Sequence, residues 1–111
     1  DMYNAQYQID HFDEQMALFD AALAATDDEN QKENILRLSA HVKFLYYAAA
    51  YESVYVNGTA AQKAEYEAGY REWFDLVNEY NIRITYQKTG LNDKTFNLNV
   101  SPLKLVYELN A

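Results

Sequence analysis

Apolar side chains recur at intervals of three and four residues along most of the first 80 residues of the chain. This spacing places them on one face of an α-helix, whose period is 3.6 residues. The pattern is interrupted at Thr26–Glu29 and at Asn57–Thr59, where residues that favour helix ends replace the apolar ones. The sequence therefore predicts three helices, over about residues 4–25, 28–56 and 60–80.

The middle helix is expected to be the central one, because it carries two apolar stripes side by side. Its principal stripe is predicted to be Ile35, Leu38, Val42, Leu45, Ala49 and Val56. The second stripe is aromatic and consists of Phe44, Tyr47, Tyr51 and Tyr55. A face this broad is typical of a helix that contacts neighbours on two sides.

The helix ends carry recognisable capping residues. Thr26 is predicted to cap the middle helix as the first residue of a capping box, and Thr59 to cap the third helix with Gln62 as its box partner. Gly58 is expected to end the middle helix in the left-handed conformation. Gly69 interrupts the third helix, where glycine costs about 1 kcal/mol relative to alanine. It indicates either a close helix crossing or a tolerated defect.

Beyond residue 80 the apolar period changes to two, which indicates strands. Alternating patterns predict strands over residues 82–88 and 95–100, joined as a hairpin. Residues 103–109 also alternate, although Ser101-Pro102 would equally start a helix. A third strand is preferred, because three strands stabilise a sheet better than two. The expected fold class is α+β, mostly α: an antiparallel three-helix bundle followed by a small antiparallel hairpin or three-stranded sheet, in one domain over residues 1–111.

The net charge of −8 is concentrated in the first third of the chain. Residues 1–33 contain nine acidic residues and one basic residue, Lys32, which gives −8, whereas the remaining residues carry eight of each sign. Nucleic acids and anionic membranes are bound by clustered Lys and Arg, so direct binding to either is disfavoured. The acidic face is either simply solvated or a docking surface for a basic partner, whose candidate residues are Asp10, Asp13, Glu14 and Asp20.

No common catalytic or metal-binding pattern is present. The chain has no cysteine, and its two histidines, His11 and His41, stand apart in the sequence. Its three glycines are too widely spaced for a phosphate-binding loop. Glu65, Glu72 and Glu79 share a helix face at intervals of seven, but a glycosidase acid would need a carboxyl group inside an apolar stripe. We therefore expect no enzymatic activity, no cofactor and no metal.

Tyr47, Tyr51 and Tyr55 form an aromatic ladder along the middle helix. Such a ladder can stack against sugar rings or form the centre of a protein interface. It can also simply pack against a neighbouring helix. The sequence leaves these alternatives open.

Two segments, Ile35–Gly58 and Ala64–Tyr86, carry a long tyrosine-bearing helix, an Asn-Gly break and an aromatic helix that ends in Tyr-Asn-Ile. This pattern resembles the helical region that follows the catalytic-type barrel of large secreted bacterial carbohydrate-active proteins, α-glucuronidase-like and related uncharacterised ones. The resemblance implies a non-catalytic accessory module of an extracellular glycan-processing protein, in contact with a protein partner or a neighbouring domain.

A competing hypothesis follows from the charge. A small acidic protein that acts alone would dock on a basic partner, for example by presenting carboxylates where a nucleic-acid-binding enzyme expects phosphates. This hypothesis implies a cytoplasmic setting. Binding to the partner would weaken with salt.

Overall fold

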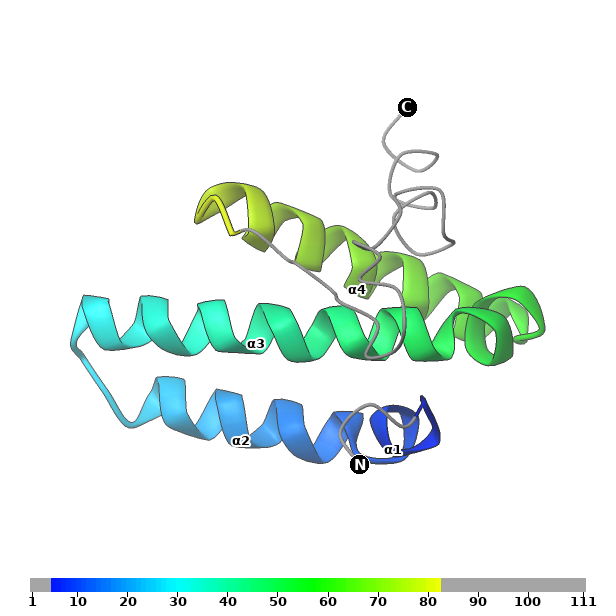
Figure 1. The fold of residues 1–111 in the computed structure, drawn as a ribbon, viewed down its shortest axis with the longest axis horizontal. Coiled ribbons are helices and arrows are strands. Elements are labelled where there is room, and N and C mark those ends of the chain that lie inside the picture. Colours follow the sequence, from blue (N-terminus) through cyan, green and yellow to red (C-terminus); the bar gives the residue numbers. More distant parts are fainter. Residues whose placement is uncertain (1–4, 83–111) are drawn as a thin grey trace, which may run out of the picture.

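The computed structural model describes residues 5–82. Its elements are the α-helices α1 (Ala5–Asp10), α2 (Phe12–Ala24), α3 (Glu29–Ala50) and α4 (Ala60–Glu79), and the π-helix η1 (Tyr51–Val56). α3 lies between α2 and α4 and runs antiparallel to both (Figure 1). α1 and α2 pack on one side of α3, and α4 packs on another. The helical-bundle prediction is confirmed.

The first predicted helix is divided at His11, whose φ and ψ of −108° and 6° lie outside the helical values. Hydrogen bonds continue across the break, from the His11 amide to the Tyr7 carbonyl and from the Gln15 amide to the His11 carbonyl, both 3.0 Å long. His11 therefore kinks one continuous helical path without ending it.

The helix caps agree with the sequence in one case and differ in two. Thr59 and Gln62 form the predicted capping box. The cap of α3 is Asp28, whose side chain accepts from the Gln31 amide at 3.0 Å, so the prediction of Thr26 was wrong. Thr26 instead accepts from the Asp28 amide and fixes the loop before the cap. The left-handed conformation predicted for Gly58 is also wrong, since no described glycine has a positive φ.

Gly58 is needed for a steric reason. A Cβ atom at this position would overlap the carbonyl oxygen of Val54. The preceding turn is a π-turn, in which the Asn57 amide donates to the Glu52 carbonyl at 2.9 Å. The chain therefore leaves the π-helix so close to its own backbone that only glycine fits.

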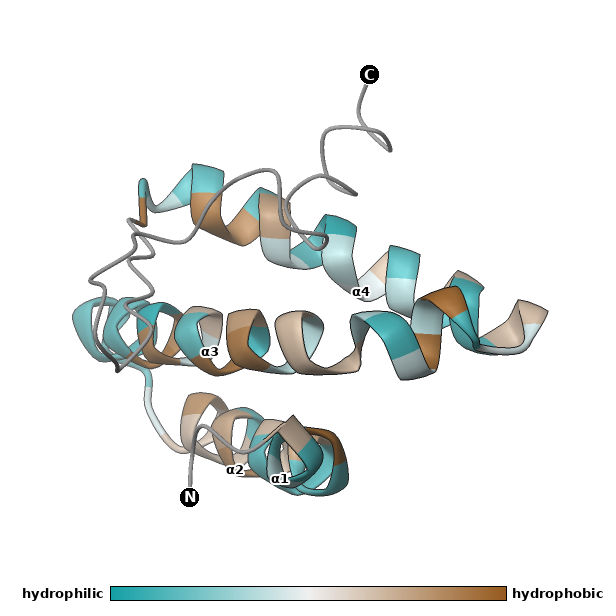
Figure 2. Ribbon diagram, turned by 45° about the vertical axis from the view of Figure 1, so that its right-hand side comes forward, coloured by the Kyte–Doolittle hydropathy of each residue, from teal (hydrophilic) through white to brown (hydrophobic). Residues whose placement is uncertain are grey.

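The core lies mainly between α3 and α4. In Figure 2 the most hydrophobic residues in the C-terminal half of α4 lie on the side that faces α3. Within residues 5–82 the buried apolar side chains are Ala40, Phe44, Tyr47, Ala50, Tyr66, Tyr70, Trp73 and Ile82. The aromatic stripe is thus the principal buried stripe of α3. The sequence predicted the stripe that begins at Ile35 as the principal one, and that prediction is wrong. Leu38 and Val56 of the predicted principal stripe are 59% and 49% exposed. Large aromatic rings bury more area than leucine or valine, so they decide which face α4 covers.

The end of α4 is a Schellman motif. Asn81 has a positive φ of 50°, the Asn81 amide donates to the Asn78 carbonyl, and the Ile82 amide donates to the Val77 carbonyl at 2.9 Å. Ile82 is only 8% exposed. It closes the helix end with a buried side chain.

The predicted fold class, α+β, is corrected. Every regular element of residues 5–82 is a helix and none is a strand. Ile82 is the first residue of the predicted strand 82–88. The structure shows that this apolar side chain is buried at the C-terminus of α4. The remainder of that strand and the predicted strands 95–100 and 103–109 lie outside the described residues.

Candidate functional site

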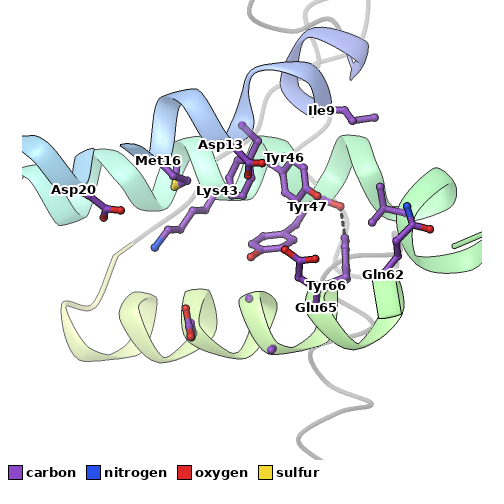
Figure 3. Close-up of a pocket in the computed structure, with 15 residues that line it drawn as sticks. Ile9, Asp13, Met16, Asp20, Lys43, Tyr46, Tyr47, Gln62, Glu65 and Tyr66 are labelled. Atoms are coloured by element: carbon purple, nitrogen blue, oxygen red, sulfur yellow. Dashed lines mark hydrogen bonds between the residues drawn. The ribbon is translucent and has the colours of Figure 1, made fainter. Parts of the chain in front are cut away.

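A groove of about 600 Å³ runs over α3 between α1–α2 on one side and α4 on the other (Figure 3). Lys43, Tyr46 and Tyr47 of α3 form its floor. Phe12 and Met16 belong to the α2 wall. The groove exists because α2 and α4 both pack on α3 without extensive contact with each other.

The α4 wall has little side-chain bulk near its middle. Ala68 and Gly69 line the groove there. A Cβ atom at Gly69 would overlap the hydroxyl group of Tyr47. The structure thus decides between the two interpretations of Gly69 in favour of a close helix crossing.

Both walls are acidic. Asp13 and Asp20 lie on the α2 wall and Glu65 and Glu72 on the α4 wall, and all four are exposed. Lys43 is the one basic residue among the residues that line the groove, which therefore carries four negative charges and one positive charge, a net −3. Within the described part of the chain none of these five residues forms an ion pair. Their charges are available to a ligand.

The four acidic residues predicted from the sequence divide into two pairs. Asp13 and Asp20 line the groove, whereas Asp10 and Glu14 do not. Asp10 accepts a hydrogen bond from the Gln6 side chain at 2.8 Å. Glu14 contacts the His11 ring nitrogen Nδ1 at 3.0 Å. Asp10 and Glu14 therefore interact with their own helical segment.

The tyrosine ladder packs on α4. Tyr47 is 5% exposed and meets Tyr66 edge to face, with ring centroids 5.1 Å apart. The rings of Tyr51 and Tyr55 also contact Tyr66, with ring centroids 6.4 and 5.3 Å from that of Tyr66. The hydroxyl group of Tyr55 donates to Glu67 at 2.9 Å. The rings of the ladder thus form part of the core, and only Tyr47 reaches the groove.

Tyr46 is a groove residue that the sequence analysis missed, because it lies between the two apolar stripes of α3. Its ring stacks on Phe12 with a centroid distance of 3.8 Å and an angle of 14°. Partial burial, followed by the charges of Glu65 and Asp13, raises the pKa of Tyr46. The floor therefore presents a neutral phenol between the two acidic walls.

Glu65 and Glu72 were also missed as interface residues. Their common helix face was visible in the sequence as a spacing of seven. What the sequence did not show is that α4 runs on the other side of α3 from α2 and sets this face across the groove from Asp13 and Asp20.

Among residues 5–82, no three His, Asp or Glu side chains are grouped closely enough to hold a metal ion. None of the helices in the same range is both long enough and apolar enough to cross a membrane.

No family model matches the chain, and no curated protein or solved structure is significantly similar to it. The groove is therefore the basis on which a function can be argued.

Proposed function

We propose that this chain is a non-catalytic helical interaction module, which docks a cationic segment of a partner protein or of a neighbouring domain in the groove over α3. The observation that carries this proposal is the arrangement of charge: carboxylates line both walls, and aromatic rings form the floor between them. Such a surface attracts a chain that has an apolar centre and basic flanks.

The physical basis is electrostatic complementarity with an apolar contact beneath it. Exposed carboxylates contribute little affinity singly, but several of one sign raise the association rate and disfavour acidic partners. Burial of the apolar surface of Phe12, Met16 and Tyr46 adds a hydrophobic contribution to the free energy of binding. Binding should weaken as salt concentration rises.

The sequence resemblance supports placing this module in an extracellular bacterial glycan-processing protein. In that setting the occupant of the groove is a basic segment of the same polypeptide. A reading frame that encodes a catalytic-type barrel upstream of this segment would agree with the assignment, and one without a barrel would contradict it.

The second candidate is a stand-alone acidic protein that docks on a basic partner. It is favoured by the position of Asp13 and Asp20, which belong to the acidic first third of the chain and face the groove. Both candidates use the same surface and differ in whether the chain is a module of a glycan-processing protein or acts alone.

The test uses two variants of the full chain with equal net charge. Asp13→Asn/Asp20→Asn removes two carboxylates from the groove, and Asp10→Asn/Glu14→Gln removes two from outside it. Each is titrated with a flexible lysine-rich peptide while amide chemical shifts are followed by NMR. The groove variant should bind about three- to tenfold more weakly than the unsubstituted chain, and the control within about twofold. Equal affinity of the two variants, or shifts outside the groove, would refute the proposal.

A further inference from the structure

We infer that the groove accepts an amphipathic α-helix with Lys or Arg at heptad spacing on both flanks of its apolar stripe. This inference rests on the proposed function and specifies its ligand. It makes the occupant the fourth helix of a bundle, of which α2, α3 and α4 supply three.

The first argument is the spacing of the acidic side chains on each wall. Asp13 and Asp20 are seven residues apart on α2, and Glu65 and Glu72 are seven residues apart on α4. Seven residues of α-helix span about 10.5 Å, which is nearly two turns. Each wall thus repeats its charge with the period of a heptad.

The second argument is the direction of the walls. α2 and α4 are both antiparallel to α3 and so run parallel to each other (Figure 1). Their two acidic rows therefore follow the same direction with the same period. A helix lying between them would place its e and g positions, which flank the apolar a and d positions, against the two rows.

The third argument is the incomplete burial of α2. None of the residues of α2 is buried, although Phe12, Met16 and Phe19 are among them. Phe12 and Met16 line the groove. In a four-helix bundle each helix directs its apolar positions into a shared core. A docked helix would cover these two side chains and make them part of a shared core.

The floor permits such a contact. Tyr46 is half-buried and offers aromatic surface, and Ala68 and Gly69 leave room beside it. The amine of Lys43 points away from both tyrosines (Figure 3). The aromatic part of the floor therefore carries no charge, and Lys43 lies to one side of it.

An extended peptide fits the acidic rows less well. Side chains on one side of a strand recur every second residue, about 6.7 Å apart. That spacing is out of step with rows of about 10.5 Å. A helix is the regular conformation that keeps cations in register with both walls.

The test compares two peptides of about three heptads and identical composition, both with leucine at a and d. One carries lysine at e and g, and the other carries the same lysines at b and c, on the outer face. The first should bind the full chain at least about tenfold more tightly and gain helicity on binding, as measured by calorimetry and circular dichroism. Asp13→Asn/Asp20→Asn and Glu65→Gln/Glu72→Gln should each reduce this preference, whereas Asp10→Asn/Glu14→Gln should not.

A steric variant tests the location independently of charge. Ala68→Trp would fill the groove from an exposed position and should weaken binding of the first peptide at least about tenfold. Asn78→Trp, on an exposed residue that does not line the groove, is its control. Unfolding curves identical to that of the parent would show that neither variant acts through stability.

The outcomes separate the two proposals. Equal affinity of the two peptides, with shifts in the groove and full sensitivity to Asp13→Asn/Asp20→Asn, would overturn the helical occupant and leave the docking function standing. Failure of every cationic peptide to bind would overturn both. Occupation of the groove by residues 83–111 of the chain itself would give that same result, so it also counts against the proposals.

Discussion

The two sides of α3 are packed very differently. Against α4 it buries aromatic rings from both helices, and Tyr66, Tyr70 and Trp73 are at most 3% exposed. Against α2 it meets a helix with no buried residue. We infer from this difference that the α4 side supplies most of the stability, whereas the α2 side leaves apolar surface for a ligand.

Side-chain hydrogen bonds also differ between the two sides of α3. On the α4 side, Trp73 Nε1 donates to the Ala40 carbonyl at 2.9 Å, and the Tyr66 hydroxyl donates to the Tyr47 carbonyl. In the described part of the chain, no side-chain hydrogen bond joins α2 to α3. Buried polar contacts of this kind fix one arrangement of two helices, so α2 should be the freer of the two neighbours.

The largest expected effect comes from truncating one aromatic ring on each side. Trp73→Ala should lower the free energy of unfolding by about 3–5 kcal/mol, because it empties a buried site and removes the indole donor to the Ala40 carbonyl. Phe19→Ala, on the half-buried side of α2, should lower it by about 1–2 kcal/mol. Urea unfolding measures both, and equal losses would break the comparison.

The second prediction is that alkaline pH destabilises the packing of α4 on α3. Burial first, and neighbouring tyrosines second, raise the pKa of Tyr66 and Tyr70 above the value of about 10 expected in the unfolded chain. Above pH 10 the unfolded state therefore loses protons that the folded state retains. The free energy of unfolding should be constant just below pH 10 and then fall by up to about 1.4 kcal/mol per tyrosine and pH unit.

Urea unfolding between pH 9 and pH 11.5 measures this fall. Tyr70→Phe is its control, because it removes one titrating group and should make the slope shallower. A profile that stays flat up to pH 11.5 would show that these hydroxyl groups are solvated.

The third prediction concerns the sign of one substitution. Helix propensity alone would make Gly69→Ala stabilising by about 1 kcal/mol. Because the new methyl group would overlap the Tyr47 hydroxyl, we expect a loss of about 1–3 kcal/mol instead. Adding Tyr47→Phe should recover part of that loss. A stabilising Gly69→Ala in thermal unfolding would mean that the helices cross less closely than the structure shows.

The smallest expected changes in stability come from removing one of two buried hydroxyl groups, those of Tyr66 and Tyr70. Tyr66→Phe removes the donor to the Tyr47 carbonyl and should cost about 1 kcal/mol. The Tyr70 hydroxyl has no hydrogen-bond partner among the described residues, so Tyr70→Phe at neutral pH should be neutral or slightly stabilising. Chemical unfolding with matched curves resolves the difference, and a larger loss for Tyr70→Phe would reverse the assignment.

The sequence sufficed to predict the helices, because their period and their interruptions are local properties. The capping box at Thr59 is of this kind, since its two residues are only three apart. The choice of buried stripe on α3 was not local. It depends on which face α4 covers, and the aromatic residues that are buried there come from both helices.

The error in fold class has a related cause. An alternating apolar pattern does not distinguish the first residue of a strand from the last apolar contact of a helix. Ile82 illustrates this, because its amide closes the Schellman motif of α4. Similarly, the sequence marked Asp13 and Asp10 alike as acidic residues of one helix. Only the position of α4 shows that Asp13 faces the groove.

The π-helix at Tyr51–Val56 makes the path from α3 to α4 tolerant of the loss of one residue. A π-helix holds more residues per turn than an α-helix, so it behaves as though it contained an insertion. Loss of one residue there would restore ordinary α-helical winding and leave the direction of the chain that follows nearly unchanged. The same loss within α3 or α4 would turn the rest of that helix by about 100° and bring a different face to its neighbour. A deletion in this segment should therefore disturb the opposition of the two acidic walls less than a deletion in either helix.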